Sequence, residues 1–121
     1  MLFRSIAEAT NNTEGVAGLA FGCALMPVKV LDNEGVGSFF NVAEGVDFAV
    51  NFTQGDKKPV KVINLSLGGE TPSTTLQRAI DRAVGGGVVV VAAAGNDGVG
   101  TISFPATLPN EIGRASCRER V

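Results

Sequence analysis

An unbroken apolar run at residues 88–94 (VVVVAAA) constrains the fold of this chain more than any other feature. A strand without polar positions is buried on both faces, so the run predicts a central strand of a parallel sheet that helices cover. Two shorter β-branched segments, residues 27–31 (PVKVL) and 60–67 (VKVINLSL), predict further strands, because turn residues or glycines follow each of them.

Segments of helical periodicity separate these strands. Ser38 predicts the N-cap of a first helix that Gly55 would end, and a second helix follows Pro72 and stops at the glycines of residues 85–87. The predicted apolar faces are Phe39, Val42, Ala43, Val46 and Val50 in the first helix and Leu76, Ile80, Ala83 and Val84 in the second. The order βαβαβ predicts an α/β fold, part of a doubly wound parallel sheet with right-handed crossovers and three layers.

Composition restricts the classes of function. A chain of 121 residues fits one domain, and a hydrophobic content of 45% excludes a disordered chain. We expect no membrane partner, because no apolar stretch approaches the roughly 18 residues of a membrane helix. We expect no nucleic-acid partner either, because the net charge is −2 and no basic cluster is present. The chain has no histidine, so the commonest general base and metal ligand is missing from it.

The two ends differ in character from the residues between them. The segments MLFRS (1–5) and EIGRASCRERV (111–121) resemble in-frame translations of short-read sequencing adapters. We therefore expect both ends to be artefacts and residues 6–110 to be the protein itself. Without Cys117 of the tail, Cys23 has no partner for an internal disulfide, and its apolar surroundings predict a small buried side chain.

The carboxyl ends of parallel strands border the crevice in which such sheets bind ligands. Loops 32–37, 66–73 and 95–100 are predicted to meet there. The last loop (GNDGVG) places Asn96 just past the central strand, where a rigid carboxamide can donate a hydrogen bond to a developing oxyanion. The alternative is that Asn96 and Asp97 only form a turn, as most Asn-Asp-Gly sequences do.

Three other loops each admit two interpretations. Residues 66–69 (SLGG) either expose backbone that a peptide joins as an added strand or simply connect a strand to a helix. Residues 35–37 (GVG) suggest a dinucleotide site, but Phe40 stands where its third glycine belongs. Residues 10–16 (TNNTEGV) offer carboxamide and carbonyl oxygens that suit calcium, or they form an ordinary solvated loop.

Taken together, residues 12–110 resemble the subtilisin-like serine proteases, peptidase family S8. The matching stretches are GVAGLAFGCALMPVKVLD, VINLSLGG, GVVVVAAAGNDG and SFPA, in the order that the family has. The resemblance implies a sheet of the subtilisin type and a serine endopeptidase that hydrolyses peptide bonds through an acyl-enzyme. It also implies a peptide or protein substrate, a monomeric intact parent and a secreted or extracellular location.

The resemblance assigns roles to individual residues. Asn96 matches the side-chain donor of the oxyanion hole, and the bond between Phe104 and Pro105 matches a peptide bond that is cis in many relatives. The residues that match substrate-binding segments are Gly35, Val36, Gly37, Ser66, Leu67, Gly68, Ala93, Ala94 and Gly95. The residues that match a structural calcium loop are Thr10, Asn12, Glu14 and Val16.

The family's catalytic triad of Asp, His and Ser is not found in this sequence. An HGTHVAG-like segment is expected just before Ile6 and a GTSMA-like segment beyond residue 110, and neither is present. We therefore expect an internal fragment of a serine endopeptidase that is inactive by itself. The alternatives are a non-catalytic Rossmann-like module that binds a nucleotide at residues 35–37, and a fragment without a function that aggregates through exposed strand edges.

Overall fold

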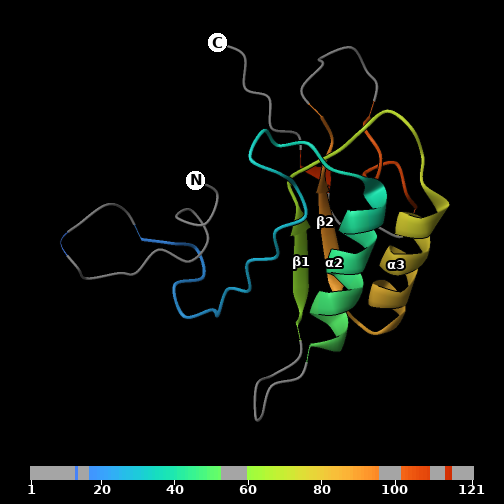
Figure 1. The fold of residues 1–121 in the computed structure, drawn as a ribbon. Coiled ribbons are helices and arrows are strands. Elements are labelled where there is room, and N and C mark those ends of the chain that lie inside the picture. The colour runs from blue at the N-terminus through green and yellow to red at the C-terminus, as the bar shows by residue number, and fades with distance from the viewer. Residues whose placement is uncertain (1–12, 14–16, 53–59, 96–101, 110–113, 116–121) are drawn as a thin grey trace.

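The apolar run at residues 88–94 forms the middle of a small parallel sheet. The computed structural model describes residues 13, 17–52, 60–95, 102–109 and 114–115. Two helices, α2 (Phe39–Asn51) and α3 (Thr74–Gly85), lie side by side against strands β1 (Val62–Leu65), β2 (Val89–Ala93) and β3 (Arg114–Ala115) (Figure 1). The strand order is β1-β2-β3, so β2 is central, as its sequence predicted.

The register of β1 and β2 determines which side chains enter the core. The two strands are parallel, with Leu65 opposite Ala92. Alternate residues of a strand share a face, and Leu65, Val90 and Ala92 belong to the same buried cluster as the apolar faces of both helices. Both helices therefore cover one face of the sheet, which confirms the α/β fold. The described residues contain the sheet and one helical layer of the three layers predicted.

Hydroxyl side chains cap both helices where the sequence predicted helix starts. The Ser38 Oγ accepts a hydrogen bond from the Asn41 N–H at 3.1 Å, and the Ser73 Oγ accepts one from the Leu76 N–H at 3.4 Å. Helix α2 ends at Asn51, before the predicted stop at Gly55, which lies outside the described residues. Helix α3 ends at the predicted glycines, where the Gly86 N–H donates to main-chain oxygens of the last turn.

An ion pair joins the two helices on their solvent side. The Arg82 guanidinium donates to both carboxylate oxygens of Asp47, at 2.6 Å to Oδ2 and 2.9 Å to Oδ1. The hydrogen bond to Asp47 raises the pKa of Arg82 above its ordinary value. Because both side chains are well exposed, this pair contributes little to stability, and the helix packing depends on the apolar cluster beneath them.

Residues 27–31 were predicted to form a strand, and this prediction is wrong: the structure gives them no regular secondary structure. The segment packs its valines against α2 instead. A Cβ placed on Gly45 would lie 2.5 Å from the Val30 Cγ1, so the missing side chain of Gly45 makes room for Val30. Val30 thus loses contact with water by packing on a helix, without a hydrogen-bonded ladder.

The prediction of a buried Cys23 is also wrong, because this cysteine is exposed. Its neighbours Leu19 and Phe21 are 95% and 63% exposed, although the segment is apolar in sequence. None of the described elements covers this segment (Figure 1), so its hydrophobicity does not lead to burial within the chain.

Strand β3 lies in the tail that the sequence suggested to be an artefact. Its residues Arg114 and Ala115 pair in parallel with Ala92 and Ala93. Strand pairing uses the main-chain N–H and C=O groups that every non-proline residue carries, so this pairing does not depend on where the tail sequence came from. The division into residues 1–5, 6–110 and 111–121 stays a prediction.

The shared core yields a prediction about stability. Ile80 is fully buried between α3 and the sheet, so Ile80→Ala leaves a cavity and is expected to lower the free energy of unfolding by about 2–5 kcal/mol. Urea unfolding of the chain, followed by circular dichroism, measures this loss. The control is Gln77→Ala on the exposed face of α3, for which a change within about 0.5 kcal/mol is expected. Equal losses in the two variants would contradict the described core.

Candidate functional site

A groove of about 430 Å³ opens beyond the carboxyl end of β1. Two main-chain segments, residues 35–37 and 66–69, form its walls, and apolar side chains lie between them. The lining residues are Leu31, Gly35, Val36, Gly37, Phe39, Val42, Ser66, Leu67, Gly68 and Gly69. The prediction that loops 32–37 and 66–73 meet at this edge of the sheet is confirmed.

Asp32 holds the first wall in place. Its Oδ1 accepts hydrogen bonds from the N–H groups of Glu34 and Val36, both at 2.9 Å, and its own N–H donates to the Val36 oxygen at 2.8 Å. Gly35 has a φ of +79°, a conformation that favours glycine, and completes the turn. The sequence identified residues 32–35 only as a turn cluster, although an aspartate that begins such a turn is the signal for this side-chain bond.

The first wall also requires a glycine at position 37. A Cβ on Gly37 would lie 2.7 Å from the Val30 oxygen and 2.8 Å from the Leu31 Cδ2. The chain therefore folds back on residues 30–31 too closely to admit a side chain, and it enters α2 directly afterwards at its cap, Ser38. This close return brings the wall over the apolar floor of the groove.

The second wall is tied to the segment that contains the cis peptide bond. Gly69 and Phe104 exchange two main-chain hydrogen bonds, at 3.0 and 2.9 Å, in an antiparallel bridge. The Ser103 N–H donates to the Ala94 oxygen at 3.0 Å, so residues 103–104 connect the end of β1 with the end of β2. The bond between Phe104 and Pro105 is cis, which confirms the prediction made for it.

Phe39 is the largest side chain in the floor of the groove. Its ring meets the ring of buried Phe104 edge to face, with centroids 5.1 Å apart and an angle of 84°. A Cβ on Gly69 would lie 2.9 Å from the Phe39 Cζ, so this glycine lets the second wall approach the ring. Leu31, Val42 and Leu67 make the rest of the floor apolar.

The structure brings together six of the predicted substrate-binding residues. Residues 35–37 and 66–68 line the groove, whereas Ala93, the last residue of β2, and the two residues after it do not line it. Asn96 and the predicted calcium ligands Thr10, Asn12, Glu14 and Val16 lie outside the described residues. Sequence reasoning missed four lining residues, Leu31, Phe39, Val42 and Gly69. The apolar ones were assigned to strand and helix faces, which gave no sign that they also border a groove.

The described residues contain neither a cluster of metal ligands nor a membrane-spanning helix. In ranges 17–52 and 60–95 and the shorter described pieces, no group of three or more His, Cys, Asp or Glu side chains is placed to hold a metal ion. Among the described residues, no helix combines the length and the apolar character that crossing a membrane requires.

The groove combines accessible main chain with an apolar floor. A Cβ on Gly35 would meet nothing within 4 Å, so another backbone can approach this point closely, whereas the missing side chains of Gly37 and Gly68 make room for other segments of this chain. An extended peptide can pair with such walls and place alternate side chains on the floor. This chemistry fits a peptide better than it fits a compact polar ligand.

The turn at Asp32 yields a second prediction. Asp32→Ala removes the acceptor for two N–H groups, and amide hydrogen exchange of Glu34 and Val36 is expected to accelerate about tenfold. Asp32→Asn keeps a side-chain oxygen and should keep most of the protection. The neighbouring variant Asn33→Ala is the control, because the Asn33 side chain binds only Lys29 outside the turn. Equal exchange in Asp32→Ala and the unmodified chain would show that the side-chain bonds do not hold the wall.

Comparisons with known proteins match nearly the whole chain to one family. The sequence model of the subtilase family matches residues 5–119. Subtilisin of Bacillus pumilus is 43% identical over 108 residues, and Subtilisin Savinase of Lederbergia lenta is 45% identical over 104 residues. Subtilisin E of Bacillus subtilis is 42% identical over 108 residues. Each of these alignments covers 86% of this chain.

The chain corresponds to only part of these relatives. It spans 37% of the subtilisin of Bacillus pumilus, 36% of Subtilisin Savinase and 27% of Subtilisin E. The extent of the family match nevertheless leaves no large part of the chain outside it. With the parallel sheet, the two covering helices and the glycine-walled groove, it shows that this chain belongs to the subtilase family.

Proposed function

We propose that this chain is the middle part of the catalytic domain of a serine endopeptidase, and that its groove holds an extended stretch of the substrate peptide. The observation that carries the proposal is the pair of glycine-rich walls, residues 35–37 and 66–69, on either side of an apolar floor. A strand of substrate between them would gain main-chain hydrogen bonds from both sides, and its side chains would gain contacts with Phe39 and Leu67.

In this proposal Asn96 stabilises the oxyanion. Strand β2 is central, and its residues Val90 and Ala92 are buried while the residues that alternate with them are half-buried, so not both of its faces are buried as the sequence predicted. A residue just beyond a central strand still starts from a rigid support. A carboxamide held there donates a hydrogen bond to the charge that develops on the substrate carbonyl, without having to reorganise during the reaction. Residues 93–95 would form a further wall near the scissile bond. The chain has no histidine, so the base of the triad must come from outside it, and the chain by itself is inactive.

The described residues do not favour the alternative of a nucleotide-binding module. A phosphate at a glycine-rich loop takes its hydrogen bonds from free N–H groups at the start of the next helix. Here the Ser38 Oγ already accepts from the Asn41 N–H, and the aromatic rings of Phe39 and Phe40 occupy the first helical positions. The alternative of a piece without a function of its own is compatible with the proposal, because it concerns the fragment and not the parent enzyme.

We also propose a structural calcium ion at residues 10–16. The donors would be the carboxamide of Asn12 and the main-chain oxygens of Thr10, Glu14 and Val16, and hard oxygen ligands of this kind suit calcium. Further ligands would come from the rest of the domain. For the parent enzyme we propose a monomer that acts outside the cell on peptides or proteins, without a nucleic-acid or membrane partner.

A hybrid enzyme tests the catalytic proposal. Residues 6–110 replace the aligned segment of the subtilisin of Bacillus pumilus, which supplies the remaining parts of the domain. The hybrid is expected to hydrolyse a chromogenic peptide anilide. Asn96→Ala is expected to lower kcat by about 10²–10³ with little change in KM, the range measured when this donor is removed from a subtilisin.

Asn41→Ala is the matched control in the hybrid, because this exposed asparagine of α2 does not line the groove. Its kcat should equal that of the unmodified hybrid. A hybrid that melts cooperatively and yet hydrolyses no peptide would contradict the proposal, and so would an Asn96→Ala variant with full activity.

Calcium is tested by thermal melting of the same hybrid. A ligand present at one hundred times its Kd stabilises the folded state by about 2.7 kcal/mol, so chelation is expected to lower Tm by several degrees. Asn12→Ala should lower Tm in calcium and remove most of the response to the chelator. An unchanged Tm after chelation would sink the proposed calcium site and leave the catalytic proposal intact.

A further inference from the structure

We propose that the groove selects peptides that carry a lysine or arginine side chain. The aliphatic stem of that side chain would lie on the apolar floor, and its cationic head would lie at the rim between Glu34 and Glu70. This inference rests on the proposed function, because it assumes that the groove holds substrate, and it adds the chemical class of the preferred residue.

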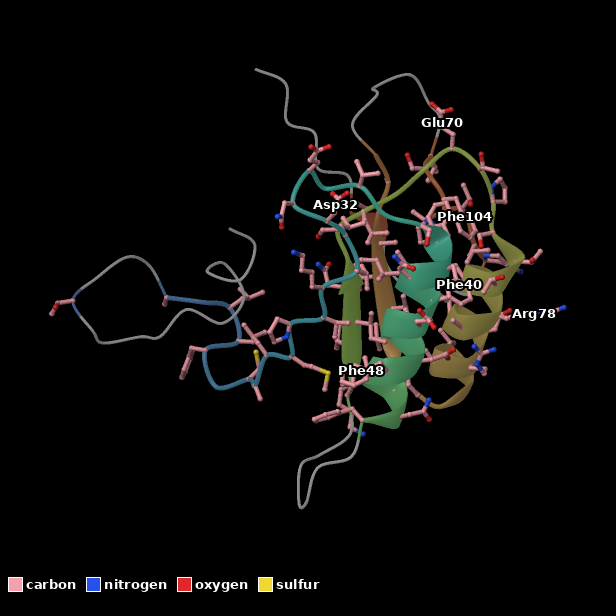
Figure 2. All side chains as sticks on the ribbon, in the orientation of Figure 1. Asp32, Phe40, Phe48, Glu70, Arg78 and Phe104 are labelled. Carbon is pink, nitrogen blue, oxygen red and sulfur yellow. The ribbon has the colours of Figure 1, made fainter. Side chains whose placement is uncertain are left out.

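A carboxylate stands at the end of each wall. Glu34 directly precedes the wall of residues 35–37, and Glu70 directly follows the wall of residues 66–69. Both glutamates are exposed. In Figure 2 the labelled residues Asp32 and Glu70 lie at the end of the unit where the strands terminate, on either side of that end. Each wall therefore has one exposed carboxylate directly next to it in the chain.

Neither glutamate is neutralised within the described part of the chain. There, the structure records no ion pair for Glu34 or Glu70, and the ion pair that it does record joins Arg82 to Asp47 on the helices. The nearest lysine in sequence, Lys29, directs its Nζ to the Asn33 Oδ1 at 2.9 Å. Asp32 adds a further negative charge to the first wall, and it binds two main-chain N–H groups.

The floor suits the other part of a basic side chain. Lysine and arginine bury their methylene stems along apolar surface and keep the charged head in water. Phe39, Leu67 and Val42 provide such a surface, and the groove of about 430 Å³ opens to solvent at the rim. A short acidic side chain would bring its charge close to two carboxylates, whereas a neutral apolar one would fill the floor but gain no charge attraction at the rim. The complementary charge therefore favours lysine or arginine.

The test compares two peptides that differ at one position, lysine in one and norleucine in the other. Norleucine keeps the stem and removes the charge. The 121-residue chain is titrated with each peptide while the amide signals of Gly35, Gly37 and Gly68 are followed by NMR. The lysine peptide is expected to bind about fivefold more tightly at low salt, as for one or two exposed ion pairs. At 1 M salt, where the Debye length is about 3 Å, the two affinities should converge.

Charge-removing variants identify the source of the preference. Glu34→Gln and Glu70→Gln are each expected to reduce the ratio, and the double variant should bind the two peptides equally. Glu44→Gln is the control, because this exposed carboxylate lies within α2 and adjoins neither wall, so its removal should leave the ratio at about five. The ratio of kcat/KM for the same two peptides in the hybrid enzyme measures the same preference independently. This measurement tests the preference even if the 121-residue chain aggregates.

The outcomes separate this inference from the proposed function. Equal binding of both peptides at low salt overturns the selection of basic residues and leaves the groove as a peptide site. A preference for lysine that survives the double variant also overturns it, since the charge would then come from elsewhere. Failure of the chain to bind either peptide, together with an inactive hybrid, overturns both proposals.

Discussion

The register between β1 and β2 is the constraint on which the groove depends. Leu65 lies opposite Ala92, and both are buried under the helices. A slip by one residue would turn Leu65 outward, so the hydrophobic core holds the two strands at this level. Because β1 and β2 are parallel and fixed in this register, their carboxyl ends lie at the same edge of the sheet, and the segments that follow the two strands lie near each other. Residues 103–104 connect these two segments through main-chain hydrogen bonds to Gly69 and Ala94.

The elements that the sequence predicted well are those whose signals are local. The cap at Ser38, the start of α3 after Pro72, the helical faces and the strand at residues 89–93 each depend on residues within one element. Residues 27–31 show where local reasoning fails. Their valines favour extended backbone, but whether that backbone joins a ladder or packs on Gly45 is decided by a helix that follows later in the chain.

The sequence predicted the walls of the candidate site but not its floor. The glycines of residues 66–69 indicated backbone that a peptide could join as an added strand, and the family resemblance implied substrate binding at residues 35–37 as well. The floor was hidden, because Phe39 fits the apolar periodicity of α2 and only the fold shows that its ring also faces the groove. The contact between Phe39 and Phe104 joins residues distant in sequence, and no periodicity predicts such a contact.

The glycines of the walls divide the groove into positions that can change and positions that cannot. At Gly37 and Gly69 any side chain would collide with the main chain of residue 30 or with the ring of Phe39. Glu70 directly follows Gly69 and Glu34 lies three residues before Gly37, yet both glutamates are exposed. The rim residues can therefore be exchanged while the walls keep their shape, so a library that varies the rim would consist largely of folded members.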